Sequence, residues 1–551
     1  MRLTGLSLIA ARRFAETSGG AHILRQKLFR DYRIGALLDL PATGRAPLAV
    51  HPGPLIQNRR RGWPGADLDP PQTPSFRSTA EDLRNAYKTG ELSPVEVLAD
   101  IRRRIDDDAF GEATFSPFCC HDFEVAMKAA EASEKRYQDG SPLGPLDGIP
   151  VPLKDQHTME GLPTGAGSSY LDELAEEDAH LTEILREAGA LLFAKTHTTE
   201  WGMNPCGFSA HLSLPRNIYD RQYSAGGSST GAAVAAGLGF TPVGSGSDGG
   251  GSIRIPAAMN GIFGIKPTFV RIGRSGDFFG SSTVSATGPL GNSTGDLVDF
   301  LSVAATVDDS SDPSRRWAPR QRNLGERWRR ALGRGVKGCR IGIPRQEWSE
   351  LDEPLQGPTL QGLAELEKDG AELVDIEVPL MAHAPAIGML SIGMETLANL
   401  HDEYEQYAEA FSDELRMTLA LLRTIDAREF LMAQRTRSAL RQTVRKALDN
   451  VDLIALPTTR TTASEYSPEL DGVPLSDITA LRDMTRFTFL ANITGLPAGS
   501  VPVGRHNGLP FGLQFVGGAW DEASVIAAMA HAERQQWTRL PAPDECRALI
   551  P

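Results

Sequence analysis

The sequence predicts an α/β protein in which one large domain follows an N-terminal extension. Segments with strand and helix patterns alternate after residue 78, as expected when helices cover a shared sheet. Hydrophobic residues make up 41% of the 551-residue chain and charged residues 23%, which is typical of a globular protein with a large core. No internal repeat is present, and nothing marks a second independent domain. We therefore predict one domain over residues 78–540, between an extension at 1–77 and a tail at 541–551.

The first hundred residues divide into a helix, a connector and the start of the domain. A helix is expected around residues 23–38, and residues 51–76 contain six prolines, which lack the amide proton that helices and central strands need. Ser78-x-x-Glu81 and Ser93-Pro94-Val95-Glu96 both have the form of a capping box, so two helices open the domain. Further expected elements are a helix at 125–137, a strand at 148–153, a helix at 182–188 and a strand at 190–194.

The middle of the chain is unusually rich in small residues. Residues 221–267 are dense in glycine, serine and alanine, yet they contain a helical run at 231–239 and a strand-like run at 252–256. Small residues between regular elements indicate close backbone approaches. The C-terminal half resumes the alternation, with strands expected at 340–343, 371–378, 452–456, 499–503 and 512–516, and helices at 358–368 and across 401–450.

Composition excludes several classes of function. The net charge of −14 argues against broad binding of nucleic acid. The sequence contains no run of about 18 apolar residues, so no membrane span is predicted. The 11 histidines are scattered without metal-ligand spacing, so we expect no metal. The five cysteines form no CxxC pair, which predicts free thiols and a cytoplasmic protein.

Two familiar motifs fit poorly. Residues 244–249 satisfy GxGxxG, but no helix opens within the motif and Arg271 and Arg274 stand near the position where a dinucleotide site needs an acid. Residues 227–231 satisfy GxSxG, but the polar segment before them is not the strand that a nucleophile elbow requires. Neither motif is our preferred interpretation.

Three segments in order carry a more specific pattern. They are Gly148-Ile-Pro-Val-Pro-Leu-Lys154-Asp155, Ser224-Ala-Gly-Gly-Ser-Ser-Thr-Gly231 and Asp248-Gly-Gly-Gly-Ser-Ile-Arg-Ile-Pro-Ala257. Together with the segments at 261–268, 492–498 and 508–517, they resemble the amidase signature family over roughly residues 78–540. Thr230 and Asn292 depart from the family pattern, which usually has glycine and arginine there.

The resemblance implies a central mixed sheet flanked by helices, and a serine–serine–lysine mechanism. Ser252 is expected to attack the carbonyl, and Ser228 to relay its proton to Lys154. Lysine acts as a base only when neutral, so its pKa must fall by roughly three units, and Asp155 should face away from it. The remaining expected site residues are Gly249, Gly250, Gly251 and Ser252 as an oxyanion hole, Gly227 in a cis peptide with Ser228, Ser229, Asp248 and Arg254 as supports of these turns, and Trp201 and Met203 as pocket residues.

The expected function is therefore hydrolysis of carboxylic amides, with esters and carbamates as alternative substrates. The expected partner is a small-molecule amide without a cofactor, and a homodimer is left open. Two other hypotheses remain: an ammonia-supplying amidotransferase A-type subunit of a larger assembly, and a catalytically silent binding scaffold. Asp248 with Arg254 also fits a purely structural buried pair, and Trp201 with Met203 fits core packing. The motifs do not specify the acyl or amine group.

Overall fold

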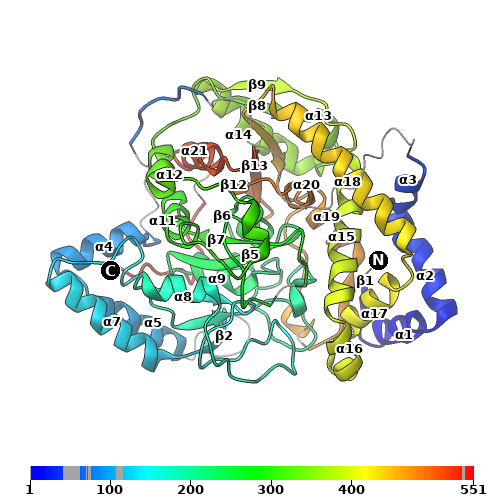
Figure 1. Ribbon diagram of the computed structural model, residues 1–551, viewed down its shortest axis with the longest axis horizontal. Helices are drawn as coiled ribbons and strands as arrows, with labels where there is room; N and C mark the ends of the chain where they lie inside the picture. The colour runs from blue at the N-terminus through cyan, green and yellow to red at the C-terminus, as the bar shows by residue number, and fades with distance from the viewer. Residues whose placement is uncertain are drawn as a thin grey trace.

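An eight-stranded mixed sheet runs through the centre of the computed structural model (Figure 1). The structure describes residues 2–40, 63–69, 71, 76–106, 116–278, 280–470, 472–535 and 540–550, so most of the connector expected at 51–76 lies outside the described residues. The strands follow the order β5-β7-β6-β12-β13-β10-β8-β9, and only the β10–β8 and β8–β9 pairs among them are parallel. The predicted α/β fold with a mixed sheet is confirmed.

The C-terminal strands follow the expected pattern, and two central ones do not. The bounds are β5 (Val243–Asp248), β6 (Phe263–Lys266), β7 (Ala286–Gly291), β8 (Arg340–Ile343), β9 (Glu372–Asp375), β10 (Leu453–Pro457), β12 (Ala498–His506) and β13 (Leu509–Gly517). Strand β8 begins and ends where predicted. Strands β6 and β7 were not predicted. Strand β6 lies inside the small-residue segment, and β7 contains Pro289, which cannot donate a hydrogen bond to a neighbouring strand.

Helices connect the strands along most of the described chain. The bounds in the first half are α4 (Ala80–Thr89), α5 (Pro94–Asp106), α7 (Phe123–Gln138), α8 (His180–Glu187), α9 (Thr230–Gly237), α10 (Arg254–Met259), α11 (Thr294–Ala304) and α12 (Leu324–Leu332). Those in the second half are α13 (Arg345–Trp348), α14 (Glu353–Lys368), α15 (Ala384–Asn399), α16 (His401–Tyr407), α17 (Asp413–Leu422), α18 (Ala427–Leu448), α19 (Ile478–Thr485), α20 (Phe489–Thr494) and α21 (Glu522–Glu533). Within the described chain, no helix combines the length and apolarity that a membrane crossing needs.

Different helices cover the two faces of the sheet. A Cβ atom added to Gly499 would collide with Met529 of α21, whereas one on Gly512 would lie 2.8 Å from Ala258 of α10 and 2.9 Å from Ser500 Oγ. Successive strand residues point to opposite faces. The face that carries Ser500 therefore packs on α10, which places the small-residue segment of the chain on that side.

The strand-like expectation at residues 252–256 is wrong. Helix α10 begins at Arg254, directly after the glycine run. The Asp248 carboxylate accepts hydrogen bonds from the backbone N–H of Gly251 at 2.7 Å and of Ile253 at 3.3 Å, which turns the chain at the end of β5. This local contact between a side chain and the following backbone overrides the strand preference of the two isoleucines.

The N-terminal segment forms more structure than the single expected helix. It contains β1 (Arg2–Thr4), α1 (Gly5–Ala15), α2 (Ser18–Asp31) and α3 (Ile34–Leu38), and Arg33, with φ of 54°, separates the last two helices. Strand β1 pairs antiparallel with β11 (Leu475–Asp477). Arg12 of α1 forms an ion pair with Asp413 of α17 at 2.7 Å. Arg416 of α17 forms another with Glu16, the residue after α1, at 2.8 Å. The blue N-terminal helices accordingly lie beside α17 in Figure 1.

The capping boxes at the start of the domain are close to the predicted positions. Ser93 and Glu96 exchange the expected hydrogen bonds at 2.8 and 3.2 Å. In the first box, the cap residue is Thr79 with Asp82, one residue later than expected. Helix α4 packs on α11 and helix α5 on α7, and Arg104 of α5 donates to Gly239 O and Leu238 O, each at 3.1 Å.

A small sheet positions the lysine segment. Its order is β2-β4-β3, with β2 at Phe118–His121, β3 at Leu153–Lys154 and β4 at Ala194–Thr196. The Lys154 N–H donates to Ser245 Oγ at 2.9 Å, and the Ser245 N–H donates to Pro152 O at 3.1 Å. These bonds fix β3 against edge strand β5, which places the lysine segment beside the serine-rich segment.

Candidate active site

Lys154 has no exposed surface and lies at the centre of a hydrogen-bonded cluster. Its Nζ atom contacts Ser228 Oγ at 2.7 Å and Ser247 Oγ at 2.9 Å. Burial lowers the pKa of Lys154 to about 7, although the negative charges of Asp248 and Asp155 act in the opposite direction. A substantial fraction of this amine is therefore neutral near neutral pH, as a base requires.

Asp155 is paired away from Lys154. Its carboxylate forms an ion pair with the buried Lys195 at 2.9 Å and accepts from the Gly165 and Gly167 N–H groups at 3.2 and 3.3 Å. These partners account for the orientation that the sequence led us to expect. Lys195 also donates to Thr164 Oγ1 at 2.8 Å, so the ion pair is embedded in further hydrogen bonds.

Ser247 and Gln156 form a second arm of the cluster that sequence reasoning missed. The Ser247 hydroxyl donates to Gln156 Oε1 at 2.6 Å. Because that proton is used, Ser247 can only accept from Lys154. The Ser228 contact, in contrast, is compatible with either direction of donation. The lone pair of a neutral Lys154 is thereby directed toward Ser228. No pattern in a single sequence marks these two residues, apart from their position beside the lysine and serine motifs.

The backbone around Ser228 is tightly enclosed. The Gly227–Ser228 peptide is cis, as the family resemblance implies, and Ser228 is 1% exposed. A Cβ atom on Gly227 would lie 2.7 Å from Asn204 O, so only glycine fits there. The Ser229 N–H donates to the Ser252 carbonyl at 3.2 Å, which ties this turn to the next one.

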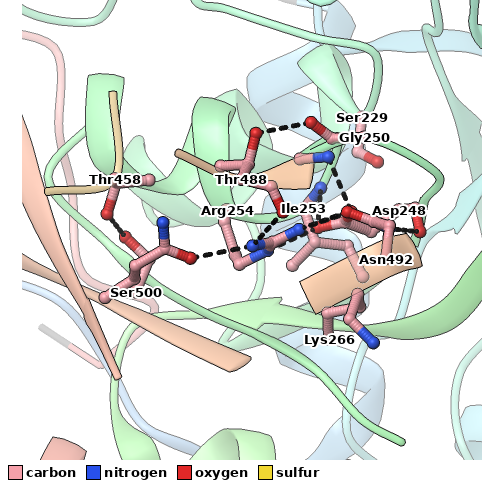
Figure 2. Close-up of polar contacts among 12 residues, drawn as sticks. Ser229, Asp248, Gly250, Ile253, Arg254, Lys266, Thr458, Thr488, Asn492 and Ser500 are labelled. Atoms are coloured by element: carbon pink, nitrogen blue, oxygen red, sulfur yellow. Dashed lines mark hydrogen bonds and ion pairs between the residues drawn. The ribbon is translucent and has the colours of Figure 1, made fainter. Parts of the chain in front are cut away.

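Asp248 and Arg254 hold the turn that carries Ser252 (Figure 2). The two side chains are fully buried and doubly bonded, with Arg254 Nε and Nη2 donating to the carboxylate at 2.9 and 3.0 Å. Burial alone would raise the pKa of Asp248, but the Arg254 charge and hydrogen bonds outweigh it and hold that pKa at about 2. Asn492 donates to Asp248 Oδ1 at 2.9 Å, and Arg254 also reaches Gln514 Oε1 at 2.8 Å.

The glycine run has unequal hydrogen-bonding roles. The Gly251 N–H, which was expected in the oxyanion hole, donates instead to Asp248 Oδ1 at 2.7 Å. The φ of Gly251, 125°, is a left-handed value that favours glycine. The Gly250 carbonyl accepts from Thr488 Oγ1 at 2.5 Å, which anchors the outside of the turn (Figure 2). Gly249 and Gly250 line cavities together with Ser252.

Two cavities meet at Ser252. The smaller has an empty volume of about 290 Å³, and the larger one of about 1080 Å³, open solvent at each mouth included. Ser228 and Trp201 line the small cavity, and Met203 lines both. Trp201 donates from its indole N–H to the Tyr170 hydroxyl at 3.0 Å. Both predicted pocket residues therefore lie at a cavity, whereas the contribution of helices α2, α17 and α19 was not foreseen.

The fold and the site match a known family. The family model described as Amidase matches residues 112–526. The chain belongs to the amidase signature family. This membership supports amide-bond hydrolysis as its chemistry. Within the described chain, no group of three or more His, Cys, Asp or Glu side chains is arranged to hold a metal ion.

Relatives within the amidase signature family differ in function. The fatty acid amide hydrolase of Arabidopsis thaliana is 31% identical over 85% of this chain and 78% of its own length. The A-type subunit of the glutamyl-tRNA(Gln) amidotransferase from Halorhodospira halophila is also 31% identical, over 82% of this chain and 95% of its own. The peptide amidase structure from Stenotrophomonas maltophilia superposes with a TM-score of 0.69 at 27% identity, covering 85% of this chain and 98% of that one.

Proposed function

We propose that this chain hydrolyses carboxylic amides through an acyl-enzyme on Ser252. The observation that carries the proposal is the 2.7 Å contact between the buried Lys154 Nζ and Ser228 Oγ, beside a cavity that Ser228 and Ser252 both line. A serine hydroxyl becomes an effective nucleophile only when a base removes its proton. Lys154 is the base, and Ser228 connects the two.

In the first half-reaction, Ser252 Oγ attacks the amide carbonyl carbon and its proton passes through Ser228 to Lys154. The negative charge on the carbonyl oxygen is stabilised by backbone N–H groups of the turn, for which Gly249, Gly250 and Ser252 are the proposed donors. The C–N bond then breaks as the proton returns from Lys154 through Ser228 to the leaving nitrogen. The free amine and the acyl-enzyme are the products of this step.

In the second half-reaction, water attacks the acyl carbonyl and gives its proton to the same relay. The ester bond to Ser252 breaks, the proton returns to its Oγ atom, and a carboxylic acid leaves. Asp248 and Arg254 act indirectly, since they hold the turn in place and do not exchange protons with the substrate.

The test is an activity screen over primary amides, anilides, carbamates and esters with three matched variants. Ser252→Ala and Lys154→Ala are expected to lower kcat by about 10⁴-fold or more, as loss of a nucleophile or its base does in other serine hydrolases. Ser229→Ala, the neighbouring hydroxyl, is expected to have a milder effect. Full turnover by Ser252→Ala would refute the nucleophile. Full activity of Lys154→Ala would instead favour a mechanism without the lysine.

A second candidate, supply of ammonia within an amidotransferase assembly, is favoured by the similarity to the Halorhodospira halophila protein. The large, mainly apolar cavity beside Ser252 favours hydrolysis of bulkier substrates. The purified chain distinguishes the two. Turnover of hydrophobic amides without added protein supports the hydrolase, whereas ammonia release from glutamine only with a partner supports the amidotransferase role.

A further inference from the structure

The two cavities that meet at Ser252 differ in size and chemistry, and this difference bears on the substrate of the proposed amide hydrolase. The small cavity is lined largely by polar groups, including Gln156, Ser228, Ser247, Ser281 and Ser285. The large cavity is lined mainly by apolar side chains, which come from helices α2, α15, α17, α19 and α20 and from the segment at residues 203–210. Ser228 borders the small cavity and is not part of the wall of the large one.

The position of Ser228 assigns the two halves of the substrate. In the proposed reaction, Ser228 delivers the proton to the leaving nitrogen, so that nitrogen must lie within hydrogen-bonding reach of Ser228. The amine half therefore occupies the small polar cavity, and the acyl half the large one. Because the empty volume is about 290 Å³ against about 1080 Å³, the leaving group is expected to be the smaller half of the substrate. The acyl half is bonded to Ser252 and extends into the large cavity.

The wall of the large cavity includes the N-terminal segment. Leu28 of α2 and Tyr32, the residue directly after α2, lie about one helical turn apart, and each is 4% exposed. Helix α2 is fixed in this position because Arg25 forms an ion pair with the buried Glu429 and donates to Thr424 O at 3.3 Å. The match to the family model begins only at residue 112, so α2 lies outside the region that the family model covers, whereas the other helices of the wall lie inside it.

Carboxyl groups on the same wall do not make it strongly charged. Glu200 and Glu414 both line the large cavity. Burial raises the pKa of Glu200 to about 7 and that of Glu414 to about 8, which keeps much of this pair neutral at neutral pH. Asn204 donates to Glu414 at 2.8 Å, and Ser412 donates to Glu200, so hydrogen bonds occupy these groups.

We propose that α2 is a specificity-determining wall, and that the substrates are amides of a bulky apolar carboxylic acid with ammonia or a short amine as the leaving group. This inference rests on the proposed hydrolase function. It assigns to the N-terminal segment the selection of long acyl groups over short ones.

The experiment compares full-length variants on hexanamide, dodecanamide and acetamide, which share ammonia as the leaving group. Leu28→Trp fills the cavity, and the ratio of kcat/KM for dodecanamide to that for acetamide is expected to fall at least tenfold. Ile23→Trp is the matched control, because Ile23 lies on the same helix but is 58% exposed. It is expected to leave the ratio within twofold of wild type.

Other outcomes separate the two proposals. An unchanged ratio in Leu28→Trp, or an equal change in Ile23→Trp, would overturn the role of α2 while amide hydrolysis stands. If Leu28→Trp does not fold, as judged by circular dichroism, Leu28→Ala decides. Enlarging the cavity should raise the ratio of kcat/KM for dodecanamide to that for hexanamide at least threefold, and an unchanged ratio would overturn the role of α2.

Faster cleavage by wild type of N-dodecylacetamide than of dodecanamide would reverse the assignment of the two cavities. No amide turnover by wild type would refute the proposed function itself.

Discussion

Replacing Gln156 by glutamate tests whether Lys154 must be neutral. Gln156 is 3% exposed, and its Oε1 atom accepts the proton of Ser247, which in turn accepts from Lys154. Gln156→Glu keeps the size of the side chain and its ability to accept that proton. It adds one negative charge to the second arm of the lysine cluster, and the ammonium form of Lys154 is stabilised by it.

The structure sets the size of the effect. Ser247 Oγ lies 2.9 Å from Lys154 Nζ and 2.6 Å from Gln156 Oε1, so the new charge lies within about 5.5 Å of the amine. At an effective dielectric constant near 20, the attraction is about 3 kcal/mol, which raises the lysine pKa by roughly two units. From a wild-type pKa of about 7, the value in the variant becomes roughly 9.

The assay is the pH dependence of kcat/KM on one amide substrate. Raising the lysine pKa means that a higher pH is needed for the neutral form, so the acidic limb should move from about pH 7 to roughly pH 9. At pH 7.5 the variant should be roughly 25-fold less active than wild type, with most of the loss recovered by pH 10. Gln156→Ala is the control, because it removes the acceptor without adding charge and should not move the limb upward. A limb that stays near pH 7 in Gln156→Glu would refute the reasoning.

Three further predictions concern the same site. In wild type, kcat/KM should rise about tenfold per pH unit below pH 7 and level off above it, as Lys154 loses its proton; a flat profile from pH 5 to 7 would contradict this. Arg254→Met leaves the buried Asp248 charge unpaired and should reduce the free energy of unfolding in urea by about 3–5 kcal/mol, and a loss below 1 kcal/mol would contradict the pairing. Gly251→Ala should lower both activity and melting temperature, because its φ is 125° and the new Cβ would lie 2.6 Å from Thr488 Oγ1, whereas Gly144→Ala, with open space around it, should change neither.

The sequence predicted the parts of the site that lie within short motifs. Lys154, Ser228 and Ser252 each lie in a segment with a recognisable pattern, and the structure brings Lys154 to Ser228 and places both serines at one cavity. Strand β8 was predicted from residues 340–343, where two isoleucines lie on either side of a glycine, which is a local signal. These features depend on nearby residues and on a resemblance carried by them.

The missed features depend on contacts between distant segments. The direction of the Ser247 hydroxyl is set by Gln156, 91 residues earlier, and nothing local reveals it. Helix α10 replaces the strand expected at residues 252–256, at a turn where Asp248 is held by Asn492, 244 residues later in the chain. The N-terminal helices separate at Arg33, whose left-handed backbone no sequence pattern marks. The role of α2 as a cavity wall follows only from its packing on the domain.

The uncharged amine at the centre of the protein also weakens the fold. In the unfolded chain Lys154 has its ordinary pKa of 10.5, so at neutral pH unfolding is accompanied by proton uptake. Below pH 7 this imbalance costs about 5 kcal/mol, and it disappears as the pH rises from about 7 to 10.5. Part of the favourable packing of the surrounding core therefore offsets this cost. Lys154→Met, which removes the amine, is expected to have a higher melting temperature than wild type.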